Sequence, residues 1–296
     1  MGEFNQLHRI QLKNGEILTY RETGKGEKTL LLIHGNMTSS KHWDLLADKL
    51  KGHFHIIAID MRGFGGSTYH HPIDSLNDFA QDLEEAMNLL GYDSYFVAGW
   101  STGGGVALEL AANAPENVQK VILLESVGIK GYPIFKKDAS GLPTSERLRT
   151  KEEIAQDPVQ VLPVLTALEA KNKEFYRMIW DATIYTNNQP DPQLYEEYLE
   201  DMLTQRNLVD VDYALVHFNM TTEDNGVNIG TGRSTLITAP VLILQGDQDF
   251  VVPMTMAEET HKHLPHSGLA ILKGCGHSPL VDDLPTLASH FTTFLG

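Results

Sequence analysis

The sequence predicts an α/β protein with a mostly parallel central sheet flanked by helices. Short, continuous apolar runs, which are typical of strands buried on both faces, alternate along the chain with helical patterns. Two of the first runs, residues 29–33 and 54–59, end directly in glycine-bearing loops. A chain that alternates strand and helix makes right-handed crossovers, and these produce parallel strand pairs.

The N-terminal part of the chain begins with a hairpin signal. Residues 8–12 and 17–20 alternate between polar and apolar side chains, and Asn14-Gly15 between them is typical of a tight turn. The predicted elements that follow are a strand at 29–33, a helix at 43–50, a strand at 54–59, a helix at 76–90, a strand at 95–98, a helix at 104–112 and a strand at 118–124.

The alternation stops after residue 124 and resumes near residue 240. The intervening sequence is richer in charged and aromatic residues and predicts helices at 152–171, 174–184, 192–205 and 209–218. Pro158 and Pro163 are expected to interrupt the first of these helices. The chain ends with a strand at 240–244, a helix at 255–264, a strand at 269–272 and a helix at 284–291. We therefore expect one core domain, made of residues 1–126 and 238–296, and a second, helical domain inserted at residues 127–237.

The composition is that of a globular protein with a sizeable core. The chain has 296 residues, 42% of them hydrophobic, and a formal net charge of -16, which argues against nucleic acid as a partner because phosphates would be repelled. The single cysteine, Cys275, excludes an internal disulfide and a cysteine-based metal cluster. The N-terminal residues lack a secretory signal pattern, and no apolar stretch is long enough for a membrane span. We expect a cytoplasmic protein that binds neither nucleic acid nor membrane.

The stretch Gly99-Trp100-Ser101-Thr102-Gly103 stands between a predicted strand and a predicted helix. In this position G-x-S-x-G is the pattern of a nucleophile elbow, a sharp turn that lifts the serine hydroxyl out of the sheet. Glycine is needed on both sides because neighbouring backbone passes close to the strained turn. The pattern alone arises often by chance, so its weight depends on the other loops of the sheet.

Other loops carry motifs in an informative order. They are His34-Gly35 with Ser39 and Trp43, Asp60-x-Arg62-Gly63-x-Gly65-x-Ser67, Gly246-Asp247-Gln248-Asp249 with Pro253, and Gly276-His277. With these motifs, which span about the whole core, the chain resembles the α/β-hydrolase fold superfamily. Within it, the chain is similar to serine esterases and lactonases with a helical cap inserted after the sixth strand. The resemblance implies that residues 127–237 are this cap.

The resemblance also implies a catalytic triad of Ser101, Asp249 and His277, in the order that this family shows along the chain. His277 would accept the serine proton as general base and later protonate the leaving group, and Asp249 would orient the imidazole. Two other acids stay open. Asp247 stands close to Asp249 and suits a turn, and Glu125 ends the strand before the insertion, where some relatives place their acid.

The same resemblance implies an oxyanion hole formed by the backbone N–H groups of Thr102 and Asn36. Because the donor at Asn36 is main chain, replacing its side chain is expected to leave the donor in place. Asp60 and Arg62 are expected to brace the floor of the site rather than to react.

Substrate contacts are expected from Met37, Trp100 and Trp180. Asn36-Met37 replaces the bulky apolar residue and proline that commonly follow His-Gly in the family, and this loop faces the pocket. Trp100 and most aromatic residues of the predicted cap are more typical of packing than of substrate binding, so only a subset is expected to touch the substrate.

Neither a metal nor an organic cofactor is implied. His53-x-His55 enters a predicted strand and His261-x-His263 ends a polar helix, which indicates structural or solvated side chains rather than metal ligands. Cys275 is expected to be a buried structural residue.

These features predict a serine hydrolase that cleaves a small or medium carboxylic ester, or a lactone, through an acyl-enzyme on Ser101. A serine at the elbow argues against haloalkane dehalogenases and epoxide hydrolases, which use aspartate there. Other functions on the same triad stay open: a carbon–carbon bond hydrolase, a cofactor-free perhydrolase and a ligand sensor built on the hydrolase fold. The expected partner is the small-molecule substrate, and the expected assembly is a monomer or a homodimer.

Overall fold

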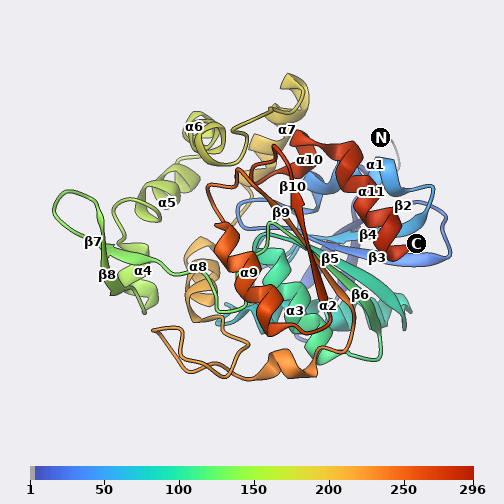
Figure 1. Ribbon diagram of the computed structural model, residues 1–296. Helices are drawn as coiled ribbons and strands as arrows, with labels where there is room; N and C mark the ends of the chain where they lie inside the picture. The colour runs from blue at the N-terminus through green and yellow to red at the C-terminus, as the bar shows by residue number, and fades with distance from the viewer. Residues whose placement is uncertain (1–3) are drawn as a thin grey trace.

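The computed structural model describes residues 4–296, and its main sheet has eight strands in the order β1-β2-β4-β3-β5-β6-β9-β10 (Figure 1). The strands are β1 (His8–Gln11), β2 (Ile17–Thr23), β3 (Lys28–Ile33), β4 (Phe54–Ile59), β5 (Tyr95–Trp100), β6 (Val118–Leu124), β9 (Val241–Gly246) and β10 (Ser267–Leu272). Strand β2 pairs antiparallel with both β1 and β4, and the other neighbouring pairs are parallel. The predicted hairpin and the mostly parallel sheet are confirmed.

Helices cover both faces of this sheet (Figure 1). One face carries α2 (Leu76–Leu90), α3 (Thr102–Asn113) and α9 (Met254–His263), and the other carries η1 (Ser40–Trp43), α1 (Asp44–Leu50), α10 (Pro279–Asp282) and α11 (Leu284–Leu295). Successive strand residues point to opposite faces, so Leu31 packs in the cluster under α2 and α3, whereas Leu30 and Leu32 pack in the cluster under α1 and α11. Each buried leucine contributes about 1.5–3 kcal/mol. No helix within residues 4–296 is both long and apolar enough to cross a membrane.

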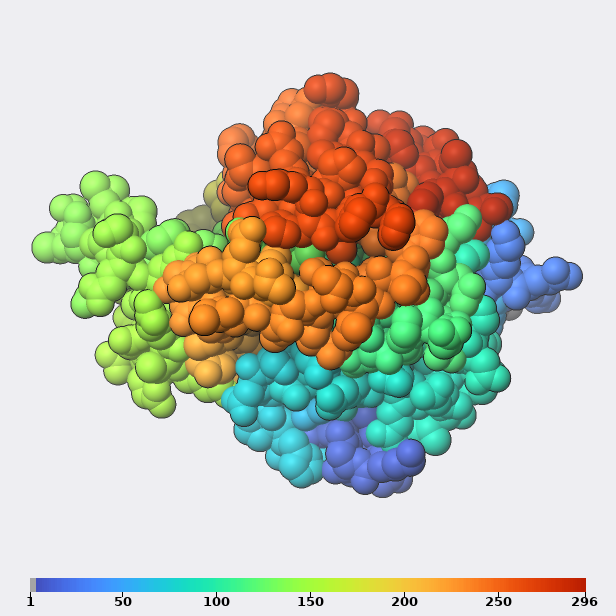
Figure 2. Space-filling model, turned by 60° about the horizontal axis from the view of Figure 1, so that its bottom comes forward, coloured from blue at the N-terminus to red at the C-terminus, as the bar shows by residue number. Residues whose placement is uncertain are grey.

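The segment between β6 and β9 contains helices and a small hairpin. Its elements are β7 (Phe135–Lys137), β8 (Pro143–Arg147), α4 (Lys151–Ala155), α5 (Leu162–Glu169), α6 (Lys173–Thr183), α7 (Pro192–Met202), α8 (Leu208–His217) and η2 (Arg233–Leu236). The helix expected at 152–171 is two helices, because Pro158 lies between α4 and α5 and Pro163 stands in the first turn of α5. The β7–β8 hairpin is absent from the sequence prediction. It projects from the rest of the molecule (Figures 1 and 2), so its residues are half-buried or exposed and show no alternating apolar pattern.

An aromatic cluster joins this segment to the core. The ring of His42 stacks on Tyr198 with centroids 4.2 Å apart, and Trp100 meets Trp180 edge to face at 6.4 Å. The Tyr198 hydroxyl also donates a hydrogen bond to Asp44. Aromatic pairs of this kind contribute about 0.5–1.5 kcal/mol each beyond the area that they bury. The segment is therefore attached to the core directly beside the predicted nucleophile elbow.

Asp60, which follows β4, organises the loop after this strand. Its carboxylate accepts hydrogen bonds from the Thr19 hydroxyl at 2.6 Å, the Ser40 N–H at 2.9 Å and the Gly66 N–H at 3.0 Å. Gly65 has a φ of 49°, and a Cβ there would lie 2.2 Å from Asp60 Oδ2. The buried carboxylate therefore ties β2 and η1 to its own loop, which fits the bracing role expected for it.

Replacing Arg62 by alanine is expected to lower the free energy of unfolding by about 3–5 kcal/mol, measured by urea denaturation. Arg62 Nη2 donates to Asp82 Oδ1 at 2.8 Å, and the two side chains are 9% and 4% exposed. Burial raises the pKa of Asp82 and the charge of Arg62 opposes this shift. Removing Arg62 therefore leaves a buried carboxyl group without its counter-charge.

Lys136→Ala is the control for this substitution. Its ion pair with Glu146 is exposed, at 58% and 67%, and should contribute little to stability. Equal and small effects of the two substitutions would contradict a bracing role for Arg62.

Candidate active site

Ser101 lies at the turn between β5 and α3, with a φ of 56° and a ψ of -119°. A non-glycine residue in this region is strained by about 1–3 kcal/mol. Main-chain hydrogen bonds hold the turn. The Ser101 N–H donates to the Leu124 carbonyl at 2.9 Å, and the Ser101 carbonyl accepts from the Val127 N–H at 3.1 Å. The predicted strand–turn–helix context of this serine is confirmed.

The glycines around Ser101 allow close backbone approach. A Cβ on Gly99 would lie 2.1 Å from the Gly103 carbonyl oxygen, and a Cβ on Gly103 would lie 2.3 Å from the Ile33 carbonyl oxygen. On the facing loop, a Cβ on Gly35 would lie 3.1 Å from the Ser101 Cβ. Side chains at these positions would push β3, α3 and the Gly35 loop away from the serine.

His277 and Asp249 form a buried hydrogen-bonded pair. The distance from His277 Nδ1 to Asp249 Oδ2 is 2.8 Å, and the side chains are 3% and 1% exposed. The other carboxylate oxygen of Asp249 accepts from the N–H groups of Val251 and Val252, at 2.7 and 2.9 Å. Burial opposes ionisation of Asp249, but the charge and hydrogen bond of His277 outweigh it, and the pKa of Asp249 is lowered. A carboxylate thus faces Nδ1, and Nε2 is left as the proton acceptor of the ring.

The loop of His277 is fixed by the residue that precedes Ser101. The indole N–H of Trp100 donates to the His277 carbonyl at 2.8 Å, and the two rings lie 5.9 Å apart between centroids. Ser101 and His277 line the same cavity. Of the side chains expected to form the triad, the structure thus pairs His277 with Asp249 and places Ser101 on the same cavity as His277.

Glu125 is buried beside Asp249. Both of its carboxyl oxygens accept a hydrogen bond from the Gly246 N–H, at 2.8 and 2.9 Å. Burial and then the charge of Asp249 raise the pKa of Glu125 well above its usual value, which favours the protonated form of this carboxyl group. Asp247 accepts a main-chain N–H of a nearby turn at 2.8 Å. Of the three acids left open by the sequence, Asp249 is the one that the structure pairs with His277.

The two predicted oxyanion donors, Thr102 and Asn36, line the same cavity as Ser101. Thr102 is the first residue of α3, so its N–H has no acceptor within the helix and lies at the positive end of the helix dipole. Asn36 stands in the loop after β3. His34 anchors this loop, because its Nε2 accepts the Met61 N–H at 3.0 Å, and burial lowers the pKa of His34 so that the ring stays neutral.

The cavity that these residues line has a volume of about 480 Å³. Met37, Trp100 and Trp180, the predicted substrate contacts, are all among its lining residues. Trp100 is also almost fully buried and bonded to the His277 loop, so its main role is packing. The segment between β6 and β9 contributes Val127, Tyr132, Ile134, Val159, Gln160, Val161, Val164, Ile179, Trp180, Thr183, Ile184, Leu208, Asp212 and Leu215.

The protein family of the chain follows from a match to a family model. A family model described as alpha/beta hydrolase fold matches residues 28–284. The chain belongs to this family. The eight-stranded sheet, the elbow and the order of the loop residues agree with that membership.

The curated relatives of this alpha/beta hydrolase include enzymes named esterase and lipase. The chain is 27% identical over 265 residues to a pimeloyl-(acyl-carrier protein) methyl ester esterase of Nitrosomonas europaea, a match that covers 88% of the chain and 92% of that protein. It is 24% identical over 295 residues to Lipase 1 of Psychrobacter immobilis, covering 98% of the chain and 84% of that protein. The solved structure of an esterase from Exiguobacterium antarcticum gives a TM-score of 0.74 at 18% identity, covering 98% of this chain and 99% of that one, which shows the shared fold.

In this hydrolase the Asn36 side chain has partners that sequence reasoning missed. Its Nδ2 donates to Asp212 Oδ1 at 3.1 Å, and its Oδ1 accepts from Gln205 Nε2 at 2.8 Å and from the Met37 N–H at 3.0 Å. Gln205 and Asp212 come from the α7–α8 loop and from α8, far away in the sequence, and no motif marks them. The side chain therefore fixes the loop that carries the expected main-chain donor, which adds a role to the one expected from the sequence.

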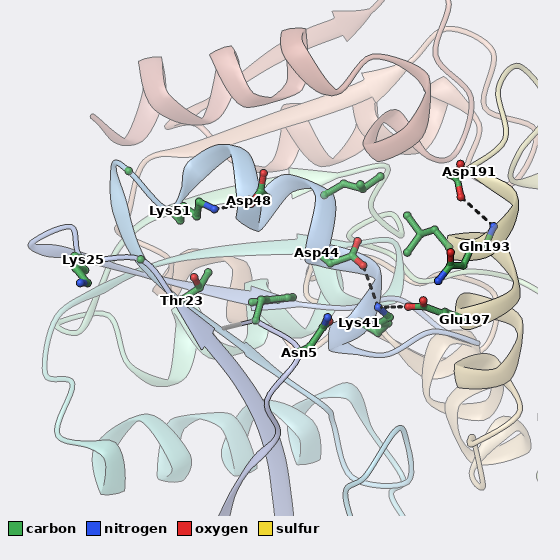
Figure 3. A pocket seen from close by; sticks show the side chains of 15 residues that line it. Asn5, Thr23, Lys25, Lys41, Asp44, Asp48, Lys51, Asp191, Gln193 and Glu197 are labelled. Atoms are coloured by element: carbon green, nitrogen blue, oxygen red, sulfur yellow. Dashed lines mark hydrogen bonds and ion pairs between the residues drawn. The ribbon is translucent and has the colours of Figure 1, made fainter. Parts of the chain in front are cut away.

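A second, larger cavity of the hydrolase has a volume of about 1020 Å³ and lies beside α1 and α7 (Figure 3). It shares no lining residue with the Ser101 cavity, and its described lining includes no serine, cysteine or histidine. Lys41 lies there between Asp44 and Glu197, at 3.3 and 2.8 Å (Figure 3), so these charges are paired with one another. The smaller cavity at Ser101 is therefore the candidate active site.

Proposed function

We propose that this hydrolase cleaves small or medium carboxylic esters, or lactones, through an acyl-enzyme formed on Ser101. The observation that carries the proposal is a strained elbow serine that lines one cavity with His277, whose Nδ1 is bonded to the buried Asp249. A serine hydroxyl is a weak nucleophile until a neighbouring imidazole accepts its proton, and the carboxylate keeps that imidazole in the required tautomer.

The proposed reaction has two halves. Ser101 Oγ attacks the ester carbonyl carbon while His277 Nε2 takes the proton of the serine hydroxyl. The resulting oxyanion accepts hydrogen bonds from the backbone N–H groups of Thr102 and Asn36. His277 then returns the proton to the leaving alcohol oxygen as the C–O bond breaks, and the acyl group stays on Ser101. Water then attacks the carbonyl carbon of the acyl group while His277 takes its proton. His277 returns this proton to Ser101 Oγ as the acid is released.

The proposed substrate carries no negative charge near the ester. A cavity of about 480 Å³ is within the range of small-molecule sites, about 300–1,000 Å³. Most of its lining is apolar, and the described lining residues include no lysine or arginine that could neutralise a carboxylate. The net charge of -16 also repels anions from the protein as a whole.

We also propose that residues 127–237 act as the cap of this site. Ser101 and His277 belong to core loops, whereas many of the apolar lining residues, including Ile179 and Trp180, belong to the segment between β6 and β9. An apolar cover of this kind excludes water and strengthens the hydrogen bonds made to the reacting atoms.

Rapid mixing with p-nitrophenyl acetate tests the proposed function. The expected result is a burst of one equivalent of p-nitrophenol per active site, followed by slower steady release as the acyl-enzyme is hydrolysed. A single equivalent with no further turnover would favour a ligand sensor. No release from any ester of a panel would overturn ester hydrolysis.

Asn36→Ala is expected to lower kcat for ester hydrolysis about tenfold while KM changes less. The main-chain N–H is retained, but the loop loses its hydrogen bonds to Asp212 and Gln205, each worth about 0.5–1.5 kcal/mol. Steady-state kinetics with p-nitrophenyl acetate measures this change.

Gln205→Ala removes one of the same contacts and should lower kcat in the same direction but less. Asn117→Ala is the control, because Asn117 donates to the Asp93 carbonyl in an exposed turn. An unchanged kcat in both Asn36→Ala and Gln205→Ala would contradict a role of these side chains in holding the oxyanion loop.

A further inference from the structure

Asp212 is a carboxyl group in the lining of the Ser101 cavity that the proposed reaction does not use. It lies on α8, and its Oδ1 accepts the Asn36 Nδ2–H at 3.1 Å. Its other oxygen has no hydrogen-bond partner among the described residues and is not fully covered by protein atoms. Asp212 is a lining residue of the cavity, and this second oxygen is its acceptor without a protein partner.

The surroundings of Asp212 are apolar. Leu208 and Leu215 stand on the same face of α8 and line the cavity with it. Asp212 is the one carboxylate among the described lining residues of the cavity, and these residues include no lysine or arginine. Burial raises the pKa of Asp212 to about 7, although the hydrogen bond from Asn36 acts in the opposite direction. A carboxyl group in such a place is unfavourable unless a donor satisfies its free oxygen.

Holding Asn36 does not require a second free oxygen. One acceptor is enough for the Asn36 Nδ2–H, and Gln205 already holds the other end of that amide at 2.8 Å. A carboxyl group at position 212 therefore supplies one acceptor more than the oxyanion loop uses. The remaining acceptor points to a ligand.

We propose that Asp212 is a specificity-determining residue whose free carboxyl oxygen accepts a hydrogen bond from a hydroxyl or amino group of the substrate. The preferred esters then carry such a group on the part that lies beside α8. This assignment rests on the proposed ester hydrolysis at Ser101 and names its substrate class.

Matched esters test the assignment. Methyl esters of straight-chain acids of increasing length are each compared with their ω-hydroxy and ω-amino counterparts, and kcat/KM is measured by acid release. The assay is run above about pH 8, where Asp212, with a pKa of about 7, is mostly ionised. At the length that reaches Asp212, the substituted ester is expected to exceed the plain ester by about 10- to 100-fold, as expected for a hydrogen bond to a charged group. The gain appears mainly in KM, because the contact is made in both the bound substrate and the transition state.

Two substitutions separate recognition from positioning. Asp212→Leu removes both acceptors, and the preference for both substituted esters should be lost. Asp212→Asn keeps an amide oxygen for Asn36 but presents an N–H to the cavity, so the preference for the amino ester should be lost. Asp210→Asn is the matched control, because this carboxylate of the same helix pairs with Lys151 at 2.7 Å and is absent from the cavity lining, so the preference should persist.

The contrary outcomes are distinct. A wild-type enzyme that hydrolyses plain esters and prefers no substituted ester at any length would overturn the assignment while the proposed function stands. So would an equal fall in kcat for all esters in the Asp212 variants with an unchanged preference, since Asp212 would then act only by positioning Asn36. A wild-type enzyme that hydrolyses no ester would overturn the proposed function, and the assignment with it.

Discussion

Replacing Ser101 by alanine is expected to lower kcat for ester hydrolysis by about 10⁶-fold, the size of loss seen when a serine hydrolase loses its nucleophile. Alanine removes the oxygen that attacks the carbonyl carbon and leaves His277 without a proton to accept. The cavity and the N–H groups of Thr102 and Asn36 remain, so residual activity comes only from binding and oxyanion stabilisation. Steady-state kinetics with p-nitrophenyl acetate measures the loss.

Thermal unfolding is the control for Ser101→Ala. Alanine is as strained as serine at a φ of 56°, and the main-chain hydrogen bonds to Leu124 and Val127 do not depend on the side chain. The melting temperature should therefore change little. A variant that folds normally and keeps more than about one hundredth of the wild-type kcat would contradict the nucleophile assignment.

Asp249→Asn is expected to lower kcat by about 10⁴-fold, the loss known for a triad whose carboxylate becomes an amide. The amide cannot stabilise the imidazolium and favours the wrong tautomer of His277, whose Nδ1 lies 2.8 Å from Asp249 Oδ2. The pKa of Asp249 is lowered, so the carboxylate is the form present near neutral pH. The same kinetic assay measures this loss.

Glu125→Gln is the matched comparison for Asp249→Asn. Burial and the charge of Asp249 raise the pKa of Glu125 and so favour its neutral form, which a neutral amide resembles in shape and charge. Its oxygen can still accept the Gly246 N–H. We expect less than a tenfold loss of kcat. A larger loss in Glu125→Gln than in Asp249→Asn, with both variants folded, would make Glu125 the triad acid.

The core of the fold could be predicted because its elements carry strong local patterns. The apolar runs at 54–59 and 118–124 coincide with β4 and β6, and the helical spacing at 76–90 coincides with α2, which a capping box at Ser75 begins. The β7–β8 hairpin could not be predicted in this way. It packs little apolar surface, so burial imposes no alternation on its sequence.

The candidate site was predictable where its residues stand in loops with a motif. Ser101, Asp249 and His277 each follow a strand, and the topology of a parallel sheet brings the ends of those strands to one edge. Gln205 and Asp212 stand in the segment between β6 and β9, and their contacts with Asn36 depend on how that segment packs on the core. Helical periodicity alone does not determine such packing.

Trp100 shows the same limit for a residue that the sequence does single out. Its place beside Ser101 suggests both substrate contact and packing, and the sequence does not separate the two. The hydrogen bond from its indole N–H to the His277 carbonyl, at 2.8 Å, gives it a further role in holding the loop of the proposed base. That partner is distant in sequence and is recognised only in the folded chain.

The acyl group on Ser101 is the most direct test of the proposed mechanism. Enzyme mixed with p-nitrophenyl acetate and quenched in acid during the burst is digested and mapped by mass spectrometry. We predict one acetyl group on the peptide that contains Ser101, and none on that peptide in Ser101→Ala. Turnover with an unmodified Ser101 peptide, or an acetylated intermediate that persists in Ser101→Ala, would contradict the proposed mechanism.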